Sequence, residues 1–399
     1  MGKSQPKIAE ELDDSGLGSG IEMEIAEVRP SDLDSEQITH PFDPKQINIH
    51  TRPFTISEVV ERLKNKEINL TPDFQRKGGI WKPVSKSRLI ESILLRIPLP
   101  VFYVHQDSEE DWLIVDGLQR ITTIKEFVLD KTFSLSEMEF LTEFDGDGFN
   151  DLPRPMQRRI NEASLHFHLI LPSTPKAVTR TIFRRINTGG LPLSNQEIRH
   201  ALYQGNSTRL LIELVEHKTY RLATTDSIRD SRMGGREAIL RFLAFWINSV
   251  DSYASNKDMD SFLSLTMESI NQMEDHELNA LKAIFDTAMI RSRAIFGEYA
   301  FRKLFEWPAP SRNPISKPLF ETWSIGLAEL SDNDFDKLKS KKQKLIKNFV
   351  KMMHDKYLPE GLEDDIYFSN SISLSTSGWK QVKYRFDAIE KLIDEIVYE

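Results

Sequence analysis

The spacing of apolar residues divides the chain into a mixed region followed by a helical region. Residues 101–104 and 112–115 have the length and composition of strands, and a polar turn joins them as a hairpin. Residues 165–171 form another predicted strand. From about residue 236 to the end, apolar residues recur at helical spacing in nearly every segment. The pattern therefore predicts an α/β (α+β) N-terminal domain followed by an all-α helical C-terminal domain.

Two capping-box patterns indicate where helices begin in the N-terminal region. Thr55 and Glu58 precede one amphipathic segment, and Ser194 and Glu197 repeat the arrangement before another. A further helix is predicted from Ser85 to the residues before Pro98. These signals place helices between the predicted strands.

The first 48 residues differ from the rest in charge and in periodicity. They contain eleven acidic and four basic residues, without a sustained strand or helix period. This composition is typical of a disordered acidic tail. The expected organisation is therefore a tail (1–48), an α/β domain (49–232) and a helical domain (233–399).

Composition excludes several classes of chemistry. The chain has no cysteine, which excludes disulfides, thiolate metal sites and a cysteine nucleophile. Its apolar runs are much shorter than the roughly 20 residues of a membrane-spanning helix, and no signal peptide is evident, so we expect a cytoplasmic protein that does not contact a membrane. The net charge of −9 gives no overall attraction to nucleic acid, although local basic patches remain.

The strongest chemical signal is a polar turn between a predicted strand and a predicted helix, at residues 116–120. A helix N-terminus directs backbone N–H groups toward an anion. Arg120 offers a planar fork for phosphate, and Asp116 can bind a metal ion or accept a proton. Nearby groups that suit a ligand are Gly117 and the hydroxyls of Thr122 and Thr123. The alternative is a tight turn with an Asp cap and a surface arginine.

The residues of this turn, Asp116-Gly117-Leu118-Gln119-Arg120, resemble the Asp-Gly-Gln-Gln-Arg signature of the GmrSD restriction endonuclease N-terminal domain family, with Leu118 as the one departure. The flanking sequence is similar as well. Phe74-Gln75-Arg76 and Trp81 lie upstream, and Ile182-Phe183-Arg184-Arg185-Ile186-Asn187-Thr188-Gly189-Gly190 lies downstream. The resemblance covers about residues 54–330.

This resemblance implies a ParB/sulfiredoxin-like domain that binds and hydrolyses a nucleoside triphosphate with Mg²⁺ in prokaryotic defence against phage or modified DNA. Asp116 would bind Mg²⁺ or activate water, Gln119 would orient that water, and Arg120 would hold phosphate charge. The residues expected to bind nucleotide are Gln75, Arg76, Trp81, Arg88, Gly117, Thr122, Thr123, Arg184, Asn187, Thr188 and Gly189. Two alternatives stay open, namely that Trp81 is a core anchor and that residues 187–190 only end a helix.

No His-Asn-His nuclease pattern is evident, since His354 is the only histidine after His276. DNA cleavage would then belong to a separate nuclease or effector chain. DNA and a second copy of the chain are further candidate partners. The lysine-rich residues 337–351 suit either a phosphodiester backbone or a solvated helix face. The second functional hypothesis is a nucleotide- or DNA-dependent sensor or adaptor subunit with little turnover.

Overall fold

The computed structural model describes residues 8–13, 16–24, 47–70, 81–186, 193–256, 258–354 and 367–399. The chain forms two compact units. One is His40–Leu202, the sheet unit, and the other is Met1–Thr39 together with Tyr203–Glu399, the helical unit. The expected domain boundary at 232/233 is thus corrected, because α7 (Asn206–Glu216) and α8 (Lys218–Thr224) pack on helices of the helical unit.

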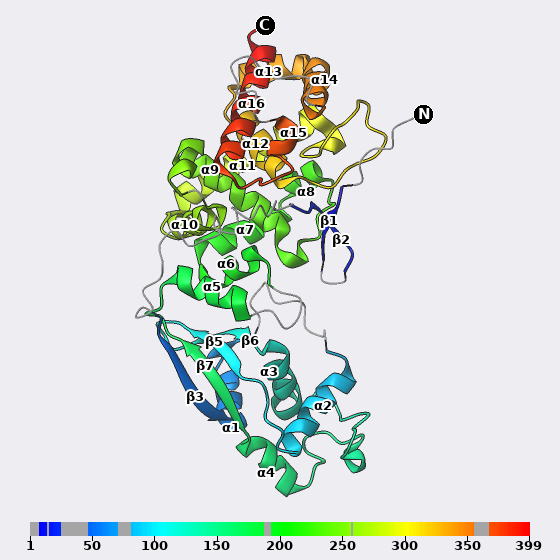
Figure 1. Cartoon of the computed structure of the whole chain (residues 1–399), viewed down its shortest axis with the longest axis vertical. Helices are drawn as coiled ribbons and strands as arrows, with labels where there is room; N and C mark the ends of the chain where they lie inside the picture. The colour runs from blue at the N-terminus through cyan, green and yellow to red at the C-terminus, as the bar shows by residue number, and fades with distance from the viewer. Residues whose placement is uncertain are drawn as a thin grey trace. The chain divides into compact units, whose positions relative to one another are not determined.

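The sheet unit contains a five-stranded mixed sheet in the order β3-β7-β5-β6-β4 (Figure 1). The strands are β3 (Ile49–Thr55), β4 (Ile68–Asn69), β5 (Phe102–Gln106), β6 (Trp112–Asp116) and β7 (Ser164–Ile170). β5 pairs antiparallel with β6 and parallel with β7. The expected hairpin and third strand are therefore confirmed, and β3 and β4 are additional strands.

One apolar core joins the helices of this unit to the sheet. The helices are α1 (Ile56–Lys64), α2 (Pro83–Leu94), α3 (Leu118–Ile124), α4 (Arg154–Glu162), α5 (Lys176–Ile186) and α6 (Asn195–Leu202). α3 continues directly into a π-helical segment, η2 (Lys125–Asp130), and a short 3-10 turn, η3 (Thr142–Phe144), follows. Thr55 and Glu58 form the expected capping box of α1. At the centre of the core, Phe102 stacks on Phe167 with ring centroids 4.9 Å apart.

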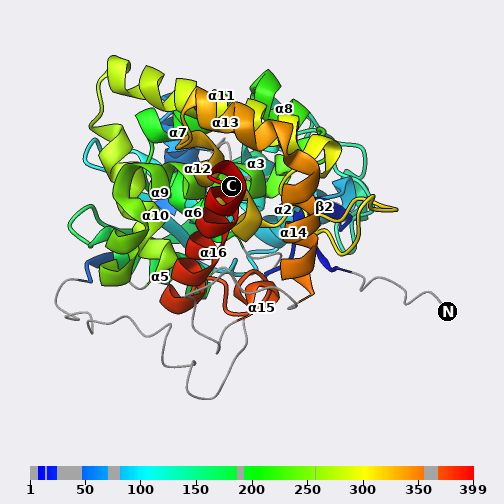
Figure 2. The same cartoon turned by 90° about the horizontal axis from the view of Figure 1, so that it is seen from above.

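The helical unit is built around α16, which packs against α9, α12, α13, α14 and α15 (Figure 2). Its helices after α8 are α9 (Gly234–Asn256), α10 (Met259–Asn271), α11 (Asp275–Phe296), α12 (Lys317–Ala328), α13 (Asp332–Ser340), α14 (Lys342–Met353), α15 (Phe368–Ser371) and α16 (Trp379–Val397). The helical region after residue 236 is confirmed, and Lys341 divides α13 from α14 within it. Among the described residues, no helix combines the length and the apolar character that a membrane span requires.

The described residues 8–13 and 16–24 differ from the expectation of a disordered tail over residues 1–48. β1 (Glu10–Leu12) and β2 (Gly18–Glu22) pair antiparallel, and Ile21 is fully buried. Ile315 extends this contact, because its N–H donates to the Gly20 carbonyl and its carbonyl accepts from Glu22 N–H. The acidic residues of this segment therefore contribute to folding, since they lie against the helical unit.

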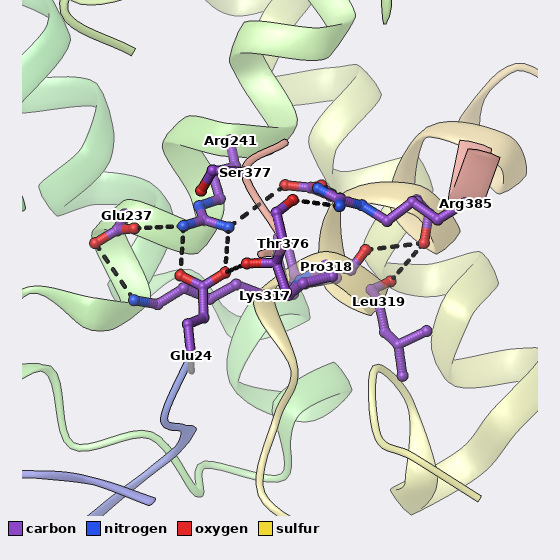
Figure 3. A network of polar contacts seen from close by, with 12 residues as sticks. Glu24, Glu237, Arg241, Lys317, Pro318, Leu319, Thr376, Ser377 and Arg385 are labelled. Carbon is purple, nitrogen blue, oxygen red and sulfur yellow. Dashed lines mark hydrogen bonds and ion pairs between the residues drawn. The ribbon is translucent and has the colours of Figure 1, made fainter. Parts of the chain in front are cut away.

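A buried network of charges connects this segment to three helices (Figure 3). Glu24 accepts from both terminal nitrogens of Arg241, at 2.9 and 2.6 Å. Arg241 on α9 also pairs with Glu237 at 3.0 Å, and Lys317 on α12 pairs with Glu237 at 3.4 Å. Beside them, Arg385 on α16 donates to Glu321. Because buried charges need partners, the network fixes how these segments pack.

Replacing Glu24 with Gln is expected to destabilise the helical unit by about 3 kcal/mol, because Arg241 is 3% exposed and loses its bidentate partner. Calorimetric unfolding of the full chain measures this change. Glu162→Gln, at an exposed position of α4, is the control and should unfold like wild type. Equal stability of all three chains would contradict the inferred importance of the pair.

The stabilisation by Glu24 is also expected to depend on pH. Burial alone raises the pKa of Glu24, but the positive charges of Arg241 and Lys317 outweigh burial and lower the pKa from 4.5 to about 2. A carboxylate whose pKa is lower in the folded state stabilises that state only while it is ionised. The difference in unfolding free energy between wild type and Glu24→Gln should therefore be full above pH 4.5 and disappear as the pH falls toward 2. Denaturant titrations across this range measure it, and a constant difference would contradict the assignment.

Candidate functional site

The turn at residues 116–120 requires glycine at its second position. β6 ends at Asp116, and Gly117 has φ 98° and ψ 10° directly before α3. A side chain disfavours this left-handed conformation. A Cβ atom there would also lie 2.4 Å from Cδ1 of Phe102. Gly117 thus lets the strand turn sharply into the helix above a core aromatic ring.

Arg120 is held by the protein itself. Its Nη2 donates to Asp116 Oδ2 at 2.7 Å and to the Val101 carbonyl at 3.3 Å, and its Nη1 donates to the Pro100 carbonyl. The guanidinium lies 4.3 Å from the Phe102 ring centroid. Burial lowers the pKa of Arg120, which the charge of Asp116 only partly offsets. Arg120 therefore links the turn to the beginning of β5. Much of the hydrogen-bonding capacity of its guanidinium is already used within the protein.

Asp116 is the accessible member of this pair. Its side chain is 41% exposed, whereas that of Arg120 is 12% exposed. One carboxylate oxygen, Oδ2, accepts from Arg120, and within the described residues Oδ1 accepts no side-chain hydrogen bond. The guanidinium therefore orients Asp116 and leaves the other oxygen for a ligand, a water molecule or a metal ion.

The other expected site residues on α3 differ in accessibility. Gln119 and Thr122 are partly exposed. Thr123 is fully buried, and its hydroxyl donates to the Gln119 carbonyl at 2.7 Å. The Thr123 side chain therefore stabilises the helix and does not lie at the surface of the turn.

The expected residues outside α3 belong to several environments. Trp81 is partly buried against the apolar core, which favours the core-anchor alternative. Arg88 on α2 and Arg184 on α5 are exposed. The remaining expected residues, Gln75, Arg76, Asn187, Thr188 and Gly189, lie outside the described residues. The site that can be described is thus the 116–120 turn and the adjoining face of α2, which packs against α3.

Among the residues that the structure describes, Asp116 has no acidic or histidine partners that would complete a protein-only metal site. No group of three or more such side chains that could hold a metal ion occurs in the described ranges. A single exposed carboxylate does fit Mg²⁺ that arrives with phosphate oxygens and water as its other ligands.

Sequence reasoning did not find the backbone carbonyls of Pro100 and Val101 or the ring of Phe102 as parts of this site. These groups belong to β5 and to the residues directly before it. A backbone carbonyl that accepts a hydrogen bond cannot be predicted from a pattern of side chains. The parallel pairing of β5 with β7 and its antiparallel pairing with β6 bring them to the turn.

Comparison with known proteins places the turn inside a family domain. Residues 56–204 match the family model described as GmrSD restriction endonuclease, N-terminal domain. This match is shorter than the expected resemblance over residues 54–330, and it ends near the boundary of the sheet unit. No curated protein matches the chain.

The matched segment contains α3 and the strands β4, β5, β6 and β7 of the mixed sheet, whereas β3 lies before it. The part of the chain from residue 56 to residue 204 is therefore similar to the GmrSD restriction endonuclease N-terminal domain.

Proposed function

We propose that the sheet unit binds a nucleoside triphosphate with Mg²⁺ at the 116–120 turn and hydrolyses it. The observation that carries the proposal is the pairing of Asp116 with Arg120 around a left-handed glycine at the start of α3. This arrangement presents an oriented carboxylate beside the amide groups of a helix N-terminus, which suit phosphate oxygens.

Each residue of the turn has its own role in the proposed reaction. The backbone amide groups at the start of α3 donate hydrogen bonds to phosphate oxygens. Asp116 binds the Mg²⁺ that accompanies the nucleotide or accepts a proton from the attacking water, and Gln119 orients that water. Arg120 acts mainly as a positioning residue, because Asp116 and two carbonyls occupy its fork. Bound Mg²⁺ would neutralise charge on the phosphate oxygens.

Asp116→Asn is expected to lower phosphate release at least about 100-fold, because the isosteric amide can neither accept the proton nor bind Mg²⁺ well. Phosphate release is measured with each of the four common nucleoside triphosphates, with and without duplex DNA. The control is Asp130→Asn, which changes an aspartate of η2 that pairs with Lys125. Hydrolysis at the wild-type rate in Asp116→Asn would refute the catalytic assignment.

A second candidate function, a nucleotide- or DNA-dependent sensor with little turnover, is favoured by a basic surface of the helical unit. Residues 337–351 contain seven lysines and no acidic residue. Lys337 pairs with Asp334 and Lys344 pairs with Glu399. Four others are exposed and form no ion pair within the described ranges, namely Lys339, Lys342, Lys347 and Lys351. Such a surface suits the phosphates of nucleic acid.

Changing these four lysines to Gln is expected to weaken binding of duplex DNA irrespective of its sequence. The dependence of log affinity on log salt concentration should become shallower by as much as about 4, near one for each lost phosphate contact. Fluorescence anisotropy at several salt concentrations measures both effects. The matched control changes the exposed residues Lys64, Lys131, Lys218 and Lys380 to Gln, with the same change in net charge. If both quadruple variants bind alike, the α13–α14 surface is not the contact.

A further inference from the structure

The acidic residues of the N-terminal segment and the basic residues of the helical unit form matched pairs. We call residues 8–24 the donor segment and the four bases that it contacts the acceptor surface. The pairs are Glu11 with Lys317 at 2.8 Å, Asp13 with Arg229 at 2.9 Å, Glu22 with Lys303 at 2.5 Å and Glu24 with Arg241 at 2.6 Å. Each acid of this set thus has its own base, and the bases come from distant parts of the helical unit.

Three of the four bases are buried beside the donor segment. Arg241, Lys303 and Lys317 are 3%, 5% and 4% exposed. Buried cations are stabilised by acidic partners. Arg241 and Lys317 also pair with Glu237, whereas among the described residues Lys303 forms an ion pair only with Glu22. An acidic occupant therefore completes the charge balance of the acceptor surface.

Backbone contacts make this surface selective for an extended strand. Ile315 exchanges hydrogen bonds with Gly20 and Glu22, and Arg229 N–H donates to the Ser19 carbonyl at 2.9 Å. Gly20 has φ 82°, and a Cβ there would lie 2.0 Å from the Ser227 carbonyl oxygen. Ile21 fills a fully buried position between these contacts. The surface thus recognises a glycine, an apolar residue and acids at fixed spacing, as in other cases where a peptide adds a strand.

The covalent path from the donor segment to its acceptor surface runs through the other unit. The donor segment ends at Glu24, residues 25–46 follow it, and all of His40–Leu202 lies before the helical unit resumes at Tyr203. The covalent connection therefore only raises the effective concentration of the donor segment near its own acceptor surface. The donor segment would form the same contacts with the acceptor surface of another copy.

We propose that the acceptor surface is a binding site for an acidic β-strand, and that the donor segment of a second copy of the chain occupies it in exchange for the chain's own. Exchange preserves all four ion pairs and the strand contacts, so mass action decides between the closed monomer and the exchanged dimer. The ligand class is an extended acidic peptide with the pattern of residues 18–24. This proposal is independent of nucleotide chemistry at the 116–120 turn.

Exchange can be tested with two full-length chains that each carry one cysteine, because the natural chain has none. One chain carries Ile21→Cys, and the other carries Ile315→Cys and a larger affinity tag. After mixing and mild oxidation, a disulfide-linked heterodimer reports the donor segment of one chain on the acceptor surface of the other. We expect a heterodimer whose yield rises with protein concentration.

Two controls define the specific signal. A chain with Ile290→Cys, at an exposed position of α11, replaces the Ile315→Cys chain and measures random collision. Adding Glu24→Gln to the Ile21→Cys chain should lower the heterodimer yield about tenfold, because Arg241 loses its partner. A chain with both Ile21→Cys and Ile315→Cys shows whether the two positions can be bridged at all.

An independent measurement does not require a disulfide. A fluorescent peptide of residues 8–24 is titrated with full-length Glu24→Gln chain, whose own donor segment is weakened, and with wild type. We expect the peptide to bind the variant at least about tenfold more tightly than wild type. Exchange with a second copy is overturned if the heterodimer is no more abundant than in the collision control at every concentration. Absence of peptide binding to either chain overturns the acceptor site itself.

Discussion

The packing of the helical unit depends on the neutralisation of Arg241, a guanidinium that is almost completely buried. Glu24 and Glu237 contact it directly, and Glu321 lies 3.8 Å from it. These carboxylates come from the N-terminal segment, α9 and α12, so a single cation joins regions that are distant in sequence. Burying an unpaired charge costs free energy, so the contacts of the three carboxylates with Arg241 depend on one another. Loss of one carboxylate leaves Arg241 less well neutralised and thereby destabilises the packing of all three segments.

The sheet unit uses the same physical rule at its candidate site, with a different result. Arg120 is satisfied by Asp116 and by carbonyls at the beginning of β5. An arginine that would bind phosphate in isolation thereby becomes a support that orients a carboxylate. The accessible chemistry of the turn then rests on Asp116 and on the amide groups at the start of α3.

Local patterns were sufficient for elements that bury several apolar side chains or carry a complete capping motif. β5, β6 and β7 carry apolar side chains into the core, and the capping box of α1 is complete in the sequence. β3 escaped prediction because it is an edge strand that is mostly exposed, so no alternation is visible in it. α4 was also missed, since it buries only Ile160.

The mixed region, the helical region, the glycine turn and the resemblance of one segment to a family domain could be predicted from the sequence, because they depend on local periodicity and on short ordered motifs. The folded structure was needed to show that residues 8–13 and 16–24 pack against the helical unit, that Arg120 is already engaged and that Thr123 is buried. Each of these outcomes depends on a partner far away in the chain: Arg241 for Glu24, Pro100 and Val101 for Arg120, and the packed core for Thr123. Ion pairs and hydrogen bonds to backbone carbonyls produce no periodic pattern in a sequence. Their partners can therefore be identified only once the folded structure brings them together.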